Sequence, residues 1–252
     1  MNVGRTRLPL TYPSSAVGRT LELSDDPFRS RACGADELYH GIAFEGAPRT
    51  ATALEFTQNA IIINGFSKAY SMTGWRLGWL VAPDHLDTCI DALNQNMNVS
   101  APTVSQRAAV AALGPEAAVE LREHVRKYEA NMRVVVDGLT RMGVQQHEYA
   151  PPRGAFYIYV DLSAHGVRDS LGMCNALLDE AGVAMTPGVD FEEEGSGYGE
   201  RRVRISYPGS TENVSEAMRR FGEWWASDKG MRWRGGAVTD GSGSGSKRAK
   251  RA

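Results

Sequence analysis

The hydrophobic and polar positions in the first half of the chain predict two strands followed by two helices. Residues 60–63 form a short β-branched run and residues 77–81 form a second apolar run, so both are expected to be buried strands. The spacing of the apolar residues predicts helices over 83–97 and 103–113. Residues 1–34 show no period of two or of 3.6 and are expected to be poorly ordered.

A long amphipathic helix is expected in the middle of the chain. Pro115 stands at its start, and apolar residues recur every three or four positions as far as Met142, before Gly143 ends the helix. Such a stripe predicts packing against a core. The later pattern predicts a strand, a helix, two more strands and a last helix, over residues 155–160, 167–181, 183–185, 203–207 and 210–225.

These patterns divide the chain into four parts and predict an α/β protein. The parts are a poorly ordered segment, a first domain, a second α+β domain that includes the long helix, and a flexible tail, over residues 1–34, 35–114, 115–228 and 229–252. The tail is rich in glycine and serine and ends in basic residues. It could contact nucleic acid, but its composition favours a solvated linker.

Composition narrows the classes of function. The 252 residues are 42% hydrophobic and 23% charged, which suffices for a buried core. A net charge of −2 and the lack of any apolar run near the roughly 18 to 20 residues of a membrane span argue for a soluble, cytoplasmic protein without a nucleic-acid or membrane partner. The three cysteines and five histidines lack the spacing of a disulfide framework or a metal site.

The candidate chemistry lies in a Ser/Gly/Thr-rich turn between the first two expected strands. Lys68 follows one strand and Arg76, eight residues later, precedes the next. A lone lysine is usually a solvated surface cation, but this one stands among small residues at the end of an apolar strand, where sites of layered α/β domains lie. With Asp36 and Tyr39 upstream, the chain offers the amine, guanidinium, carboxylate and phenol that bind pyridoxal phosphate.

These residues lie in segments that resemble a known family. The stretch NGFSKAYSMTGWRLGW resembles the cofactor-lysine motif of class I/II aminotransferases, which are fold-type I pyridoxal-phosphate enzymes. ADELYHGIAFEG is similar to their aspartate–tyrosine segment, and PRGAFYIYVDL, GVAMTPGVDF and RRVRISYPGSTENVSEAMRRF resemble their small-domain strands and final helix, in the same order. The resemblance runs from about Ala35 to Trp225.

The resemblance implies a role for each cofactor residue. Lys68 would form the Schiff base with pyridoxal 5′-phosphate and then move a proton between the substrate Cα and the cofactor. Asp36 would pair with the pyridine nitrogen, and Tyr39 would contact the phenolic oxygen. Arg76 and Ser67 would bind the phosphate. The implied fold is a fold-type I large domain, with a mainly parallel sheet and helices, followed by a smaller α+β domain.

The resemblance also implies the substrates. Arg204 would bind the α-carboxylate of an amino acid, a task suited to a planar guanidinium, whereas Arg201 and Arg202 are expected to be exposed strand arginines. The expected reaction is the transfer of an amino group from an L-amino acid to a 2-oxo acid. A homodimer is expected if the fold is complete enough.

The chain departs from the family before Asp36. Family members carry there a large stretch with a phosphate loop, a ring-stacking aromatic residue and much of the dimer interface, and no equivalent is visible in the 35 residues present. The segment 28–34 lacks the apolar strand expected to deliver the aspartate. The large domain is therefore expected to be truncated, with uncovered apolar faces. A non-catalytic remnant and a pyridoxal-phosphate lyase of the same fold stay open as alternatives.

Overall fold

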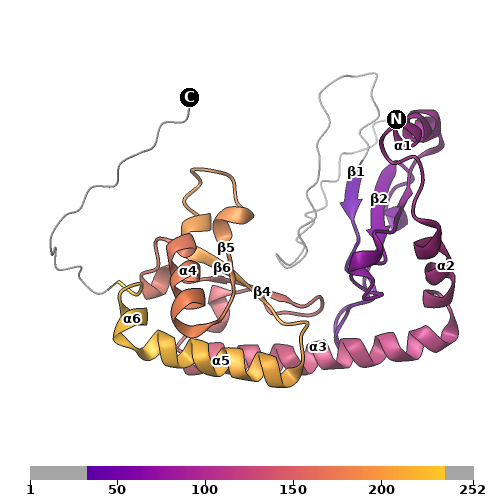
Figure 1. The fold of residues 1–252 in the computed structure, drawn as a ribbon. Coiled ribbons are helices and arrows are strands. Elements are labelled where there is room, and N and C mark those ends of the chain that lie inside the picture. The colour runs from indigo at the N-terminus through magenta and orange to yellow at the C-terminus, as the bar shows by residue number, and fades with distance from the viewer. Residues whose placement is uncertain (1–32, 236–252) are drawn as a thin grey trace, which may run out of the picture.

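The computed structural model describes residues 33–235, and expectations for residues 1–32 and 236–252 lie outside this range. The described chain forms two small three-stranded sheets, and the long helix α3 (Pro115–Arg141) runs beneath both of them (Figure 1). The first sheet belongs to the part before α3, and the second belongs to the part after it. The expected α/β organisation is confirmed.

The first sheet contains β1 (Cys33–Asp36), β2 (Ala60–Gly65) and β3 (Gly78–Val81), in that order. The strands β1 and β2 are parallel, whereas β2 and β3 are antiparallel. The carboxyl ends of β1 and β2 and the beginning of β3 therefore lie at one edge of the sheet.

Strand β1 differs from the sequence prediction, which found no strand before Asp36. Its residues pair with β2 in parallel register, from Cys33 opposite Ala60 to Asp36 opposite Ile63. The segment lacks an apolar run, so backbone pairing with β2 specifies this strand. Its first two residues lie inside the segment 1–34.

Burial in the first part is partial, and the prediction that residues 77–81 form a buried strand is wrong. Every residue of β3 is exposed, and on β2 Ala60 and Ile62 are buried while Ile63 is 52% exposed. The helices α1 (Asp87–Met97) and α2 (Thr103–Ala112) leave most of their apolar side chains exposed, because no other described element covers them. Residues 83–97, expected to be one helix, are divided into a 3-10 turn and α1.

Helix α3 begins and ends as its sequence predicts. Gly114 is its N-cap and Pro115 its first residue, where a missing N–H costs little. The helix packs along α5 (Thr211–Ala226). Gly138 permits this close approach, since a Cβ there would lie 2.6 Å from the terminal methyl carbon of Met218.

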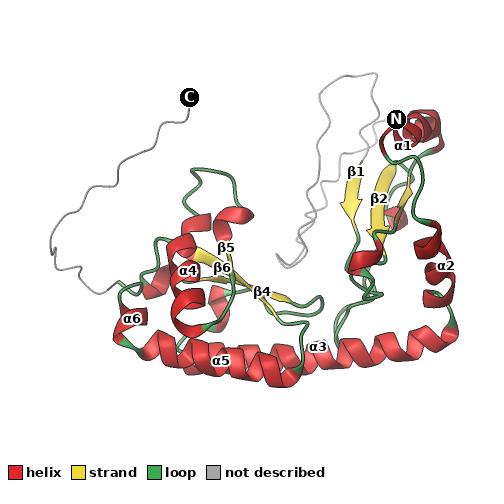
Figure 2. Cartoon of the chain, viewed as in Figure 1, coloured by secondary structure: helices red, strands yellow, loops and turns green. Residues whose placement is uncertain are grey.

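The second sheet is antiparallel, and only one of its faces packs against helices. It contains β4 (Tyr157–Asp161), β6 (Arg202–Ser206) and β5 (Thr186–Pro187), in that order (Figure 2). Alternate residues are buried on this face, namely Ile158, Val160, Val203 and Ile205. They belong to one core with α3, α5 and α4 (Ser170–Ala181). The opposite face carries polar and aromatic side chains.

Two boundaries in this part differ from the prediction. The short strand expected at 183–185 lies at Thr186–Pro187, because Thr186 pairs with Arg204 while Val183 is buried after α4. Helix α6 (Asp228–Met231) and Trp233, which packs against the core, fall mostly within the expected tail.

The described chain also contains short 3-10 helices. They lie at Ala53–Glu55, Thr73–Trp75, Asp84–Leu86, Gln146–Glu148, Ser163–His165, Gly188–Asp190 and Gly199–Arg201. Within residues 33–235, no helix is long and apolar enough to cross a bilayer.

Candidate functional site

The first sheet brings three predicted site residues to one edge. Asp36 is the last residue of β1, and Lys68 follows the parallel strand β2 by three positions. Arg76 precedes the antiparallel strand β3 by two positions, so it enters the sheet from the same edge. Side chains far apart in the sequence thus share the carboxyl edge of the sheet, where ligands of α/β folds commonly bind.

The loop between β2 and β3 has a strained backbone. Ser71 and Arg76 have φ angles of 55° and 51°, a left-handed conformation that is uncommon for residues other than glycine. The loop is held internally, since Thr73 Oγ1 donates to the Ser67 carbonyl at 2.8 Å and Arg76 Nη1 donates to the Thr73 carbonyl at 3.2 Å. It also contacts α3, with Ser71 Oγ 3.2 Å from His124 Nδ1. Such strain is found at functional sites, where surrounding contacts maintain it.

Ser67 and Arg76 line the same shallow hollow, of about 230 Å³. Gly65 and Gly78 also line it, and a Cβ on Gly78 would lie 2.8 Å from the Asn64 carbonyl oxygen. A hydroxyl and an exposed guanidinium at a glycine-lined surface form a suitable site for a small anion.

Lys68 is half-buried beside Tyr39. Its Nζ lies 6.0 Å from the centroid of the Tyr39 ring. Among residues 33–235 the ammonium has no hydrogen-bond or ion-pair partner, which leaves its nitrogen available for a ligand.

Tyr39 joins the two parts of the molecule. Its hydroxyl donates to the hydroxyl of Tyr157 on β4 at 2.9 Å, and their ring centroids are 5.6 Å apart. Burial, together with this hydrogen bond, raises the pKa of Tyr39 well above its ordinary value. The phenol is therefore protonated at neutral pH and can donate a hydrogen bond.

Arg204 lies on the open face of the second sheet, between two aromatic rings. Its Cζ is 4.5 Å from the centroid of Tyr157 and 4.3 Å from that of Phe191. Its Nη2 has one weak contact, at 3.5 Å from Thr186 Oγ1, and its Nε is buried without a hydrogen-bond partner in the described structure. An arginine held in this way, without a carboxylate beside it among the described residues, is suited to binding an anion.

The other two arginines of this segment differ from their prediction as exposed strand residues. The Arg202 side chain is only 28% exposed and forms ion pairs with Asp161 at 3.2 Å and Glu192 at 2.8 Å. Arg201 Nε lies 3.4 Å from the same Asp161 carboxylate. Both arginines have a carboxylate counter-ion within the protein, which separates them from Arg204.

Asp36 is exposed, and its Oδ1 accepts a hydrogen bond from the Leu38 backbone N–H at 3.1 Å. Its carboxylate has no ion-pair partner among the described residues. The negative charge of Asp36 makes a minor contribution to the raised pKa of Tyr39.

Sequence reasoning missed Tyr157 and Phe191. Tyr157 connects Tyr39 to Arg204, and Phe191 covers the other side of the guanidinium. The alternation of residues 155–160 could have placed Tyr157 on the open face of its strand. Phe191 lies on a loop, where no period indicates its direction.

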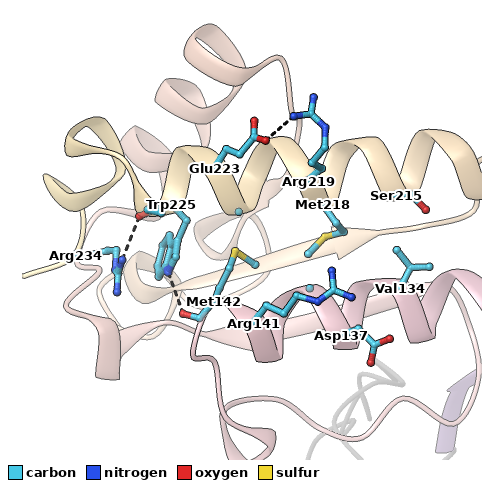
Figure 3. Close-up of a pocket in the computed structure, with 13 residues that line it drawn as sticks. Val134, Asp137, Arg141, Met142, Ser215, Met218, Arg219, Glu223, Trp225 and Arg234 are labelled. Atoms are coloured by element: carbon cyan, nitrogen blue, oxygen red, sulfur yellow. Dashed lines mark hydrogen bonds and ion pairs between the residues drawn. The ribbon is translucent and has the colours of Figure 1, made fainter.

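A larger hollow, of about 690 Å³, lies between α3 and α5 (Figure 3). Val134, Met142, Met218 and Trp225 are among its apolar lining residues, while Arg219 is paired with Glu223. None of the six predicted site residues lines it. The smaller hollow is therefore the one relevant to the candidate chemistry.

The comparison with protein families agrees with this geometry. The family described as aminotransferase class I and II matches residues 34–221, which is most of the chain. The chain belongs to this family. The match includes both sheets, except the first residue of β1, and all six predicted site residues.

Individual relatives support the same conclusion. The valine–pyruvate aminotransferase of Mycobacterium tuberculosis is 44% identical over 193 residues, which is 77% of this chain and 48% of the relative. A (5-formylfuran-3-yl)methyl phosphate transaminase of Methanocaldococcus jannaschii is 36% identical over 75% of this chain and 49% of the relative. The crystal structure of an aminotransferase from Mycobacterium tuberculosis superposes with a TM-score of 0.71 at 43% identity, covering 77% of this chain and 49% of that one. The chain thus spans about half the length of these relatives.

Proposed function

We propose that this family member takes part in pyridoxal-phosphate-dependent transfer of an amino group between an L-amino acid and a 2-oxo acid. The observation that carries the proposal is the placement of two cations without counter-ions. Lys68 lies beside Tyr39, and Arg204 lies against Tyr157, the hydrogen-bond partner of Tyr39. An amine and a guanidinium in this arrangement are suited to an aldehyde cofactor and a carboxylate substrate, respectively.

The residues present are suited to hold the phosphate, the pyridine nitrogen and the phenolic oxygen of pyridoxal phosphate. Ser67 and Arg76 share the anion-binding hollow and would hold the phosphate. Asp36 has a carboxylate free of other cations among residues 33–235 and would keep the pyridine nitrogen protonated. Tyr39 is protonated and would donate to the phenolic oxygen, in exchange for its bond to Tyr157.

Lys68 would carry out the proton transfer. When bound, pyridoxal phosphate supplies an aldehyde and an electron-withdrawing ring that weaken the Cα–H bond of an amino acid. The Lys68 amine would move a proton between the substrate Cα and the cofactor, as a positioned general acid and base. The lack of a carboxylate partner leaves its lone pair available for this role once it is deprotonated.

Arg204 would orient the substrate. Two parallel hydrogen bonds from its guanidinium to the α-carboxylate would fix the amino acid and direct the Cα–H bond. The aromatic rings on both sides keep the guanidinium in one plane. Because the relatives are twice as long, we propose that the complete site also needs groups beyond those described, in a homodimer.

Absorbance spectroscopy with added pyridoxal phosphate tests the cofactor proposal. We expect a band from the lysine-bound cofactor that borohydride makes permanent, with the label located at Lys68 by peptide mapping. Lys68→Ala should abolish the band, and Lys68→Arg should also abolish it while keeping the charge. Lys127→Ala is the matched control, since Lys127 is exposed on α3. A band that survives in Lys68→Ala would contradict the proposal.

A second candidate is a chain that binds the cofactor without catalysis. The exposed apolar strand β3 favours it, because this face is next to the hollow that contains Arg76. Adding an amino acid to the loaded protein separates the two candidates. Conversion of the band to that of the amino form of the cofactor supports transamination, whereas an unchanged band supports the non-catalytic chain.

A further inference from the structure

A cluster of charged and aromatic side chains lies next to Arg204 on the open face of the second sheet. Arg202 Nη1 donates to Glu192 Oε1 at 2.8 Å, and Arg202 Nε donates to Asp161 Oδ2 at 3.2 Å. The Tyr159 hydroxyl donates to the same Glu192 oxygen at 2.9 Å. Glu192 is therefore held by two strands, through Arg202 of β6 and Tyr159 of β4.

The loop that carries Glu192 is anchored at both ends. Gly188 and Gly199 approach so closely that a Cβ on Gly188 would lie 2.6 Å from the Gly199 carbonyl oxygen. Ser170 Oγ donates to that carbonyl at 2.7 Å in a buried hydrogen bond. Between these ends, residues 193–197 are exposed. The Glu192 carboxylate thus ties the first half of the loop to the sheet.

Phe191, the neighbour of Glu192, lies over Arg204. The centroid of its ring is 4.3 Å from Arg204 Cζ and 6.1 Å from that of Tyr159, to which it is nearly perpendicular. Because Phe191 and Glu192 are adjacent, the bonds that hold the carboxylate also fix the backbone from which the ring projects.

We propose that Glu192 is a positioning residue for carboxylate binding, and that its bonds to Arg202 and Tyr159 keep Phe191 against Arg204. The inference rests on the proposed function, because carboxylate binding by Arg204 belongs to it. A guanidinium makes two parallel hydrogen bonds to a carboxylate only in one orientation. With Phe191 in place the Arg204 side chain keeps this orientation before the substrate arrives, which lowers the entropy lost on binding.

The positioning claim is tested first by nuclear magnetic resonance on the unloaded chain. The measured quantity is the nuclear Overhauser effect between the Phe191 ring protons and the Arg204 side chain. We expect the wild-type signal to weaken in Glu192→Gln, which retains a hydrogen-bond acceptor for Tyr159, and to vanish in Glu192→Ala. Glu216→Gln is the matched control, because Glu216 pairs with Arg219 and Arg220 on α5. An undiminished signal in Glu192→Ala overturns the proposal.

The second measurement is the affinity for pyruvate, used as the simplest 2-oxo acid probe and measured by isothermal titration calorimetry with added pyridoxal phosphate. We expect Glu192→Ala to bind about tenfold more weakly, the loss that follows when one of two charge-assisted hydrogen bonds is misaligned. Glu216→Gln should bind as the wild type does. Unchanged affinity in Glu192→Ala overturns the positioning claim while the proposed function stands. Equal binding by the wild type and Arg204→Ala, or none by either, would instead reject the carboxylate role of Arg204, and the positioning claim with it.

Discussion

The parts of the molecule before and after α3 have similar elements and very different packing. After α3 begins, side chains such as Leu177 and Val160 are completely buried, and one core joins α3, α4, α5 and the second sheet. Before α3, Ile42 and Phe44 join this core and Phe66, Met72 and Ala109 form a small separate cluster, while the apolar residues of β3 lie in solvent. An apolar pattern in the sequence therefore predicts a strand or helix, but burial also needs a second element to cover it.

The proposed site contains residues from both parts of the molecule. Arg204 stands on the well-packed sheet, whereas Lys68, Ser67 and Arg76 belong to the less covered one. Local opening should therefore affect the cofactor side before the substrate side. Four predictions test the contrast between the two parts.

The largest contrast is expected in cysteine reactivity, since the two parts contain one described thiol each. Cys89 is exposed on α1, whereas burial, with the negative charges of Asp190 and Asp169, raises the pKa of Cys174 to about 12. In a Cys33→Ser background, we expect Cys89 to react with a disulfide reagent at least about a thousandfold faster than Cys174. Similar rates without denaturant would show that the second part opens as readily as the first.

Truncating an apolar side chain should lower the free energy of unfolding substantially only in the second part. Phe221 on α5 is 1% exposed, whereas Leu93 on α1 is 60% exposed. We expect Phe221→Ala to lower the free energy of unfolding by about 3 to 5 kcal/mol and Leu93→Ala by less than about 0.5 kcal/mol. Urea denaturation measures both values. A comparable loss in the two variants would mean that α1 is covered in solution.

A buried polar contact should contribute less to the free energy of unfolding than a core side chain does, but more than a surface contact does. Asn131 on α3 is fully buried, and its Nδ2 donates to the carbonyls of Tyr207 and Gly209, at 2.9 Å each. We expect Asn131→Ala to lower the unfolding free energy by about 2 kcal/mol, because two carbonyls lose their donor. Asn98→Ala, at the exposed end of α1, is the control and should cost less than about 0.5 kcal/mol. The same denaturation experiment would contradict the prediction if the two losses were equal.

The smallest expected effect on stability is that of Asp161, and it should depend on pH. Burial alone would raise the pKa of Asp161, but hydrogen bonds from Ser163 and Arg202 and the charge of Arg201 lower it below its ordinary value. A carboxyl with a lowered folded-state pKa contributes stability above its unfolded pKa and loses this contribution as the pH falls through the folded value. We expect Asp161→Asn to cost about 1 kcal/mol at pH 7 and progressively less as the pH falls below about 4.

Glu55 is the comparison for Asp161 in the first part. Hydrogen bonds from Arg49 and from the Thr52 backbone lower its pKa as well, but the pair is exposed to solvent. Glu55→Gln should therefore change the pH dependence of stability less than Asp161→Asn does. Thermal denaturation across a pH series measures both, and an equal or larger effect of Glu55→Gln would contradict this ranking.

Most of the fold could be predicted from local patterns. The helix from Pro115 and the strand from Ala60 follow from residue spacing and from the residues at their ends. Strand β1 could not be found in this way, because it depends on pairing with β2. The short strand of Thr186 was misplaced for the same reason, since its register is fixed by Arg204 of β6.

The candidate site, too, could be predicted from the sequence only in part. The sequence by itself determined the family, through the motif around Lys68 and Arg76, and it singled out Arg204. Only the tertiary structure decided which arginine of β6 lacks a counter-ion, because Asp161 and Glu192 reach Arg202 through strand pairing and a loop. Tyr157 and Phe191 became partners of Arg204 for the same reason. A side chain's type is encoded locally, but whether its charge is satisfied depends on residues that the fold brings beside it.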